Sequence, residues 1–343
     1  MILNKQEARK IINLNPKGLI DVDIAERQFE VILKGFNHLN QSKNNFLYIA
    51  DEVGLGKTYV ALGIASLLRH FSSNKEHHKD CIIVPKKNLQ SKWRKEIRNF
   101  ISNNYLLECN IVKTPLGTSV GLCEDVNIHP RLEYVSRENP SYEIFRNSSF
   151  SISASSDDWK EKLVDQLPES VAYIFKAAIE RFNTIEQDVL LRRLYAYLLN
   201  ITMPDFDLLI VDEAHNFKHG TQGEVSYRNQ VVSRMMGVIY AEDEVIFREF
   251  PELKAKLKPL SGKVILLSAT PLDNGVYEIA NQLDCFLPNH PYRNLEAELK
   301  SKRLKEDLGT FMIRGVMNIK LSGESLSRNR YRHEHRNGNV LKE

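Results

Sequence analysis

The stretch from Phe46 to Thr58 is the feature that most constrains what this chain can fold into. Residues 46–50 form an apolar run with the length of a buried strand. Gly54 and Gly56 follow, and from Val60 onward apolar residues recur at helical spacing. Strand, glycine-rich turn and helix in this order predict a phosphate-binding loop, because backbone amides and a helix N-terminus then face an anion.

The side chains of this loop suit ATP. Lys57 can reach the β- and γ-phosphates, and the Thr58 hydroxyl is a natural ligand of Mg²⁺. The general pattern has glycine where this chain has Asp51, and a glycine-rich turn without a ligand is the alternative interpretation. We assign nucleotide binding to Asp51, Glu52, Val53, Gly54, Leu55, Gly56, Lys57 and Thr58.

The amino-acid composition limits which kinds of partner the chain can bind. Its 343 residues are 42% apolar and 27% charged, as in an ordinary globular protein. With 47 basic and 44 acidic residues the net charge is only +3, so a surface for nucleic acid has to be a local patch. The 4 cysteines lack a C-x-x-C pair, which predicts reduced thiols rather than zinc ligands. No run approaches the roughly 18 apolar residues of a membrane span, so we expect a cytoplasmic protein without a membrane partner.

Two more strands end in polar motifs. Residues 207–211 and 263–267 are apolar runs, and each is followed directly by side chains that can carry chemistry. Because ligands bind beyond the carboxyl ends of parallel strands, we expect both motifs to meet the phosphate-binding loop at one edge of a sheet. The motif residues are Asp212, Glu213 and His215 after the first run and Ser268, Ala269 and Thr270 after the second.

Phosphoryl-transfer chemistry assigns the roles. Asp212, directly or through water, is expected to hold Mg²⁺ together with Thr58, and Glu213 is expected to orient or deprotonate the attacking water. We therefore predict Glu213, Asp212 and Lys57 as the catalytic group. Simple solvation of a strand end is the alternative for the two carboxylates, and a structural turn is the alternative for Ser268 and Thr270.

The rest of the chain fits an α/β fold. Apolar spacing predicts helices over 24–39, near 89–100, 159–175, 185–198, 227–240 and 276–286, and a buried strand over 81–84. Alternating strands and helices with continuous apolar strands predict a parallel sheet covered by helices on both faces, plus a helical insertion near 157–200. Residues 114–156, rich in Ser, Asn, Pro and Gly, read as a loop-heavy insertion. We expect Trp93 to be helix core rather than a base-stacking platform.

Three motifs together resemble a known family. The segments 51–58, 212–215 and 268–271 are similar to the first motor lobe of superfamily-two helicases, and most of all to the Snf-type, chromatin-remodeller-like ATPases in a DEAH-box variant. In that family the first motif reads Asp-Glu-x-Gly-Leu-Gly-Lys-Thr, which accounts for Asp51. Further similar stretches are Val84-Pro85 with Leu89, Trp93 and Glu96, Pro271-Leu272 with Asn274, and Phe286-Leu-Pro288.

The resemblance, which covers about 27–314, implies a RecA-like P-loop domain that hydrolyses ATP with Mg²⁺. It implies that Gln28 reads the adenine edge, and that His215, Ser268, Ala269 and Thr270 couple the nucleotide to motion between lobes. It implies nucleic acid, duplex DNA above all, as a partner, and a second motor lobe in the same frame or in a partner chain.

The sequence also departs from the family. Ser-Ala-Thr stands where Snf-type proteins more often have Gly-Thr-Pro, and Gly315 stands where a second arginine is expected after Arg314. We expect an extension over 1–23, the lobe over 24–314 with insertions at about 103–202 and 216–262, and a basic tail or linker over 315–343. Without a second lobe we expect ATP binding with slow hydrolysis.

Two other functions are compatible with the same motifs. One is a P-loop ATPase that acts on protein partners, which nucleic acid would not stimulate. The other is a non-catalytic ATP-binding module, which would show no measurable turnover.

Overall fold

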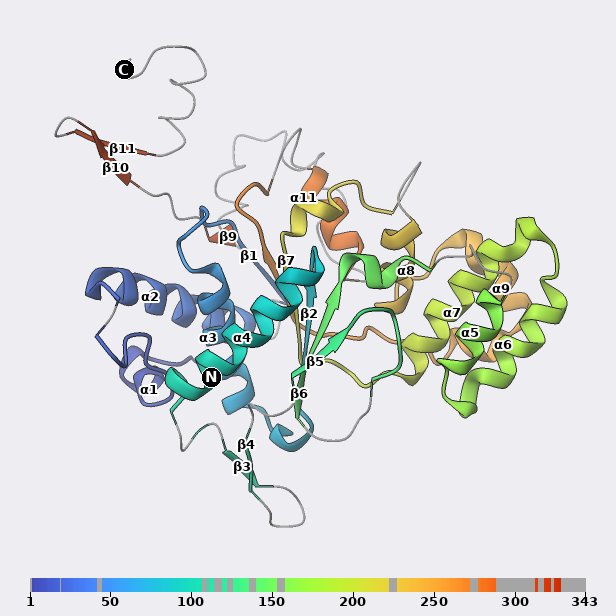
Figure 1. Cartoon of the computed structure of the whole chain (residues 1–343), viewed down its shortest axis with the longest axis horizontal. Helices are drawn as coiled ribbons and strands as arrows, with labels where there is room; N and C mark the ends of the chain where they lie inside the picture. Colours follow the sequence, from blue (N-terminus) through green and yellow to red (C-terminus); the bar gives the residue numbers. More distant parts are fainter. Residues whose placement is uncertain are drawn as a thin grey trace.

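The centre of the fold is a parallel sheet of seven strands in the order β5-β6-β2-β7-β8-β1-β9 (Figure 1). The computed structural model describes residues 2–18, 20–41, 45–106, 109, 111–113, 119–121, 126–135, 140–152, 158–221, 227–271, 277–287, 312–313, 318–321 and 324–327. The sheet strands are β1 (Phe46–Ile49), β2 (Lys79–Val84), β5 (Val126–His129), β6 (Ser141–Arg146), β7 (Leu208–Asp212), β8 (Val264–Leu267) and β9 (Met312–Ile313). Every pairing between these strands in the described part of the chain is parallel, which confirms the predicted α/β class.

Among the described residues, four helices pack on one face of the sheet. They are α1 (Lys5–Arg9), α2 (Val22–Leu39), α3 (Lys57–His70) and α4 (Lys87–Asn103). Alternate strand residues such as Leu47, Ile82 and Ile265 point into this layer, as the two-residue period of a strand requires. Helices α2 and α3 approach closely, since a Cβ added at Gly63 would lie 2.4 Å from Cδ1 of Ile32. This contact holds α2 against the helix that follows the phosphate-binding loop.

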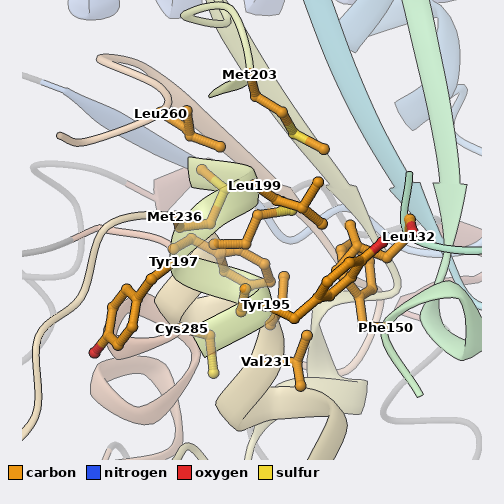
Figure 2. Close-up of a cluster of buried hydrophobic side chains, with 14 of the residues drawn as sticks. Leu132, Phe150, Tyr195, Tyr197, Leu199, Met203, Val231, Met236, Leu260 and Cys285 are labelled. Carbon is orange, nitrogen blue, oxygen red and sulfur yellow. Dashed lines mark hydrogen bonds between the residues drawn. The ribbon is translucent and has the colours of Figure 1, made fainter. Parts of the chain in front are cut away.

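The opposite face carries a helical body. It consists of α5 (Trp159–Asp165), α6 (Glu169–Arg181), α7 (Asp188–Thr202), α8 (Tyr227–Met235), α9 (Glu244–Glu249) and α10 (Pro251–Lys254), and α11 (Tyr277–Asp284) packs on the same face. Figure 2 shows its core, where Leu199 and Tyr195 of α7 lie among Phe150, Val231 and Met236. The helices of the two segments that the sequence marks as separate insertions therefore pack together on one side of the sheet.

The prediction of a loop-heavy segment over 114–156 is wrong for much of its length. It contains β5 and β6, two strands of the main sheet, with β6 buried along nearly all its length. The signal was hidden because Glu143 interrupts the apolar run of β6. That carboxylate is buried and accepts hydrogen bonds from Ser141 Oγ at 2.7 Å and from His129 Nε2 at 2.6 Å. A buried carboxylate satisfied by such partners is tolerated in a core strand.

Two antiparallel pairs accompany the sheet. Ile111–Lys113 (β3) pairs with Ser119–Gly121 (β4), and Asn318–Leu321 (β10) pairs with Glu324–Ser327 (β11). Short 3₁₀ turns over Lys75–His77, Asn147–Phe150, Ile185–Gln187, Ala214–Phe217 and Ala241–Asp243 complete the elements. Within the described residues, no helix combines the length and apolarity needed to cross a bilayer.

The end of α8 offers a test of the fold. Gly237 has a φ of +96°, and a Cβ there would lie 2.2 Å from the backbone oxygen of Lys258. We expect Gly237→Ala to lower the free energy of unfolding by at least about 2 kcal/mol, since left-handed strain costs about 1–2 kcal/mol and overpacking about 1–3 kcal/mol. Urea denaturation measures the loss. Gly262→Ala is the control, because its Cβ would meet nothing within 4 Å; an equal loss in both variants would contradict the strain at Gly237.

Candidate active site

Strands β7, β8 and β1 lie side by side and bring the three sequence motifs to one edge of the sheet. Leu267, the last residue of β8, is paired with Ile49 of β1 and with Asp212 of β7. The phosphate-binding loop, Glu213 and Ser268 therefore leave the sheet at the same level, as the resemblance implies.

The phosphate-binding loop turns between β1 and α3. Gly54 and Gly56 have φ angles of +91° and +81°, a region that favours glycine. Lys57 opens α3, and its Nζ donates to the backbone oxygens of Asp51 at 2.7 Å and Glu52 at 3.2 Å. The side chains of Asp51 and Glu52 are buried, whereas Val53 is 58% exposed at the tip. The lysine thus lies inside the loop, with its ammonium group at the centre of the backbone turn.

Gln28 joins α2 to this loop. Its Nε2 donates to the backbone oxygen of Leu55 at 3.1 Å, and a Cβ added at Gly56 would lie 2.2 Å from the same nitrogen. The structure therefore places Gln28 against the loop, 27 positions away in sequence. Glycine at position 56 is required twice, by its backbone conformation and by this close approach.

The charges of the three motifs act on one another. Burial lowers the pKa of Lys57, while the carboxylates of Glu213, Asp51 and Asp212 oppose that shift. Burial also raises the pKa of Asp212, and the Trp93 hydrogen bond partly offsets it. The pKa of Glu213 is lowered, first by its hydrogen bond to His215. The ammonium group of Lys57 and the half-buried carboxylates of Asp212 and Glu213 come from distant segments of the chain. They therefore interact electrostatically at one place in the fold.

Glu213 has an unusual backbone. Among the described residues other than glycine, it alone has a positive φ, at +51°. A left-handed conformation costs a residue with a side chain roughly 1–2 kcal/mol. Such strain is found mostly at functional sites, where it aims a side chain. The left-handed conformation turns the chain at Glu213 away from the line of β7, at the same sheet edge as Lys57.

Sequence reasoning missed one residue of this site. Trp93 on α4 is 1% exposed, so its prediction as helix core is confirmed, but its indole Nε1 also donates to Oδ2 of Asp212 at 2.8 Å. Two signals were available in the sequence, the spacing that placed Trp93 on the buried face of α4 and its position in a stretch similar to the helicase family. Its partner lies 119 positions further along the chain.

The last motif lies beside the acidic pair. Ser268 is buried, and its Oγ lies 2.9 Å from Nδ1 of His215 and accepts the backbone amide of Thr270 at 3.1 Å. The same Nδ1 lies 3.3 Å from Oε2 of Glu213. Ala269 is half-buried and Thr270 exposed. His215 therefore links the acidic motif to the Ser-Ala-Thr motif.

The donor set suits a magnesium ion. Thr58 and Asp212 are half-buried, and they offer a hydroxyl and a carboxylate, the hard oxygen ligands that Mg²⁺ prefers. The raised pKa of Asp212 shows a carboxylate that burial has deprived of solvent and that a cation would stabilise. The residues present therefore fit the metal.

The fold and the positions of these motifs define the nucleotide-binding lobe of a superfamily-two helicase-like ATPase. The family model described as type III restriction enzyme, res subunit, matches residues 21–271, more than half of the chain. The chain belongs to this family. No curated protein matches it.

Three solved structures resemble the chain in fold. The Sulfolobus solfataricus SWI2/SNF2 ATPase core in complex with dsDNA is 14% identical over 92% of this chain and 46% of its own, with a TM-score of 0.46. A nuclease-deletion mutant of the Type ISP restriction-modification enzyme LlaGI, with a DNA substrate mimic, is 12% identical over 82% and 21%, with a TM-score of 0.38. S. cerevisiae Dbp5 bound to Nup159 and Gle1 is 11% identical over 76% and 46%, with a TM-score of 0.37. The chain thus spans less than half the length of each.

Proposed function

We propose that this chain is the ATP-binding and ATP-hydrolysing motor lobe of a DNA-directed translocase of the Snf type, with a DEAH-box variant of the acidic motif. The observation that carries this proposal is the meeting of Lys57, Asp212 and Glu213 at one edge of the sheet, within electrostatic reach of one another. A lysine in a glycine loop beside two carboxylates is what phosphoryl transfer from a nucleoside triphosphate requires.

Each residue of the site has a separate role in binding or hydrolysing ATP. The amides of residues 54–58 and the start of α3 bind the phosphates, and Lys57 exchanges its bonds with the loop carbonyls for bonds to the β- and γ-oxygens. Asp212 and Thr58 would hold Mg²⁺, which neutralises developing charge on the phosphates when bound. Glu213, ionised because its pKa is low, accepts a proton from the attacking water. Gln28, fixed against the loop, contacts the adenine.

Trp93 tests the metal assignment. Replacing its indole by phenyl in Trp93→Phe removes the hydrogen bond that orients Asp212. Loss of such a contact to a metal ligand typically weakens metal binding about 10–100-fold. We expect the Mg²⁺ concentration needed for half-maximal ATP binding to rise at least tenfold, measured by calorimetry. Trp159→Phe in the helical body is the control; an unchanged Mg²⁺ requirement in Trp93→Phe would contradict the assignment.

A basic surface on α4 favours nucleic acid over a protein partner. The helix starts just after the carboxyl end of β2, so it opens at the same sheet edge as the candidate site. Its exposed cations are Lys86 at the N-cap, Lys87, Lys92, Arg94, Lys95 and Arg98. Six cations on one helix of a chain whose net charge is +3 form the local patch that a phosphate backbone needs. We propose duplex DNA as the ligand of this surface.

The experiment measures DNA binding and ATPase activity together. We expect weak binding to duplex DNA that falls steeply with salt, and ATP turnover that rises when DNA is added. The double variant Lys92→Glu/Lys95→Glu should bind DNA at least tenfold more weakly, with a salt slope smaller by about one to two. Lys162→Glu/Lys176→Glu makes the same change of charge on the helical body and should bind as wild type does. Salt-independent binding would favour the protein-directed ATPase.

We further propose that rapid turnover needs a second motor lobe, in the same polypeptide or in a partner. The resemblance implies arginines from that lobe at the transferring phosphate, and such an arginine is worth about 10³–10⁵ in rate. Arg314, the candidate closing arginine of the first lobe, lies outside the described residues, as do the tail arginines 328–336.

A further inference from the structure

Side chains hold the backbone of the segment that follows β7. Residues 213–220 leave the sheet as a short 3₁₀ turn and a loop, and irregular backbone of this kind needs partners for its carbonyl oxygens. The side-chain donors to these oxygens are Asn216 Nδ2 to Glu213 at 2.7 Å, Arg228 Nη2 to Asn216 at 2.9 Å, Asn281 Nδ2 to Lys218 at 2.9 Å and Asn229 Nδ2 to Gly220 at 2.7 Å. Two of these donors, at positions 228 and 229, belong to α8, so the insertion over 216–262 contacts the segment that carries the acidic motif.

The carbonyl oxygen of Glu213 accepts two hydrogen bonds from Asn216. The backbone amide of Asn216 donates at 3.0 Å and its side-chain Nδ2 at 2.7 Å. The direction of this carbonyl is set by the ψ angle of Glu213, which is +52° at a φ of +51°. In an extended strand ψ is near +135°, so the carbonyl would point elsewhere and both bonds would be lost. The two bonds from Asn216 therefore stabilise the left-handed conformation of Glu213.

Arg228 of α8 fixes Asn216 in turn. Its Nη2 donates to the backbone oxygen of Asn216, and its Cζ lies 4.9 Å from the centroid of the Phe217 ring, so one guanidinium contacts two successive residues. Phe217 is buried and cannot move away from this contact without disturbing the core. Nε and Nη2 of Arg228 also donate to Oδ1 of Asn229, at 3.2 and 3.0 Å, which orients the planar group. The guanidinium is therefore held on two sides where it meets the turn.

We infer that Arg228 is a positioning residue that holds Glu213 in its left-handed conformation through Asn216. A residue with a Cβ persists in that conformation only when the surrounding structure holds it there. The path consists of two contacts, from Arg228 to the backbone of Asn216 and from Asn216 to the carbonyl of Glu213. The insertion that carries α8 thereby determines how a residue at the sheet edge is aimed.

The consequence for catalysis rests on the proposed function. The backbone of Glu213 sets the direction of its Cα–Cβ bond, and with it the place of a carboxylate that is to accept a proton from water. A displacement of about 1 Å at a reacting group can cost about 10²-fold in rate. We expect Arg228→Met to lower kcat about tenfold or more. The affinity for Mg·ATP, measured by calorimetry, should stay unchanged, because the phosphate-binding loop is not part of this path.

The strain itself can be measured in the full chain without ATP, by comparing glycine with alanine at position 213. Both Glu213→Gly and Glu213→Ala lack the carboxylate, so the contacts of that group cancel in the comparison. At an ordinary position glycine is the less stable of the two, whereas at a left-handed position it is favoured. We expect Glu213→Gly to have the higher urea midpoint in the otherwise wild-type chain. In the Arg228→Met background the alanine variant can relax, so the difference between the two midpoints should vanish or change sign.

A matched arginine and a second variant complete the design. Arg181 of α6 also donates to a backbone carbonyl, that of Glu249 at 3.0 Å, and its Cζ lies 5.1 Å from the centroid of the Phe250 ring. Arg181→Met should leave the difference between glycine and alanine unchanged. Asn216→Ala removes the amide donor at a half-buried position and should abolish the difference as Arg228→Met does. It decides the question if Arg228→Met does not fold.

A midpoint for Glu213→Gly that is no higher than that for Glu213→Ala would overturn the inference. A difference that survives in a folded Arg228→Met or Asn216→Ala, or that is lost equally in Arg181→Met, would overturn it as well, because a merely structural arginine lowers both midpoints alike. If the midpoints behave as expected but wild type hydrolyses no ATP under any condition, the hydrolytic function fails while the positioning of Glu213 stands.

Discussion

We expect the Glu213→Gln variant to bind Mg·ATP about as tightly as wild type and to lose turnover by about 10²–10⁴, the usual contribution of a general base. Glutamine has nearly the same shape as glutamate and can occupy the same backbone conformation at a φ of +51°. Its amide can still accept a hydrogen bond from His215, but it cannot take a proton from water. Binding by calorimetry and steady-state phosphate release separate the two effects.

Glu143→Gln is a matched control for this prediction. Glu143 also hydrogen-bonds a histidine, at 2.6 Å, and its pKa is also lowered, but it lies within β6 rather than after a strand end. Turnover should survive that change, measured at a temperature where the variant is folded. If Glu213→Gln loses ATP affinity in step with turnover, Glu213 is a structural residue or a metal ligand and its proposed role is wrong.

The sequence predicts the sheet edge well because its motifs are local. A strand, a glycine turn and a helix occupy consecutive residues between Phe46 and His70, and each requirement is met by neighbours. The strands ending at Asp212 and Leu267 are continuous apolar runs, so a parallel sheet follows from their pattern. Each motif directly follows its strand in the sequence. The parallel sheet therefore places all the motifs at one edge, whatever the length of the insertions between them.

The parts that the sequence did not predict depend on distant partners. Strand β6 was missed because a buried Glu143 is acceptable only beside His129 and Ser141. The apolar spacing around Trp93 indicates only a core residue, because it does not show that the indole nitrogen donates a hydrogen bond to Asp212. The Tyr48 hydroxyl donates to Gln282, 234 positions away, and apolar periodicity records neither hydroxyl nor amide partners. Polar satisfaction in a core is a tertiary property, so periodicity locates the elements but not the hydrogen bonds between them.

Lys57→Ala is expected to weaken Mg·ATP binding at least tenfold. Hydrogen bonds to charged groups contribute about 1.5–3 kcal/mol, and a tenfold change corresponds to about 1.4 kcal/mol. The loss should be larger than the bonds alone suggest, because the carboxylates of Glu213, Asp51 and Asp212 interact electrostatically with the ammonium group and would repel the phosphates without it.

One further variant separates charge from packing at position 57, and a second, elsewhere in the chain, is its control. Lys57→Met keeps the apolar stem and should lose as much affinity as Lys57→Ala if the charge is what binds the phosphates. Lys254→Ala removes a lysine from the exposed face of the helical body and should bind ATP as wild type does. Calorimetric titration with Mg·ATP measures all three. Equal affinity in wild type and Lys57→Ala would show that this loop does not hold the triphosphate, and the glycine turn would then be structural. Lost binding in both position-57 variants, together with preserved binding and lost turnover in Glu213→Gln, is the pattern of a hydrolytic nucleotide site, since an ATP-binding module without catalysis has no turnover for Glu213→Gln to remove.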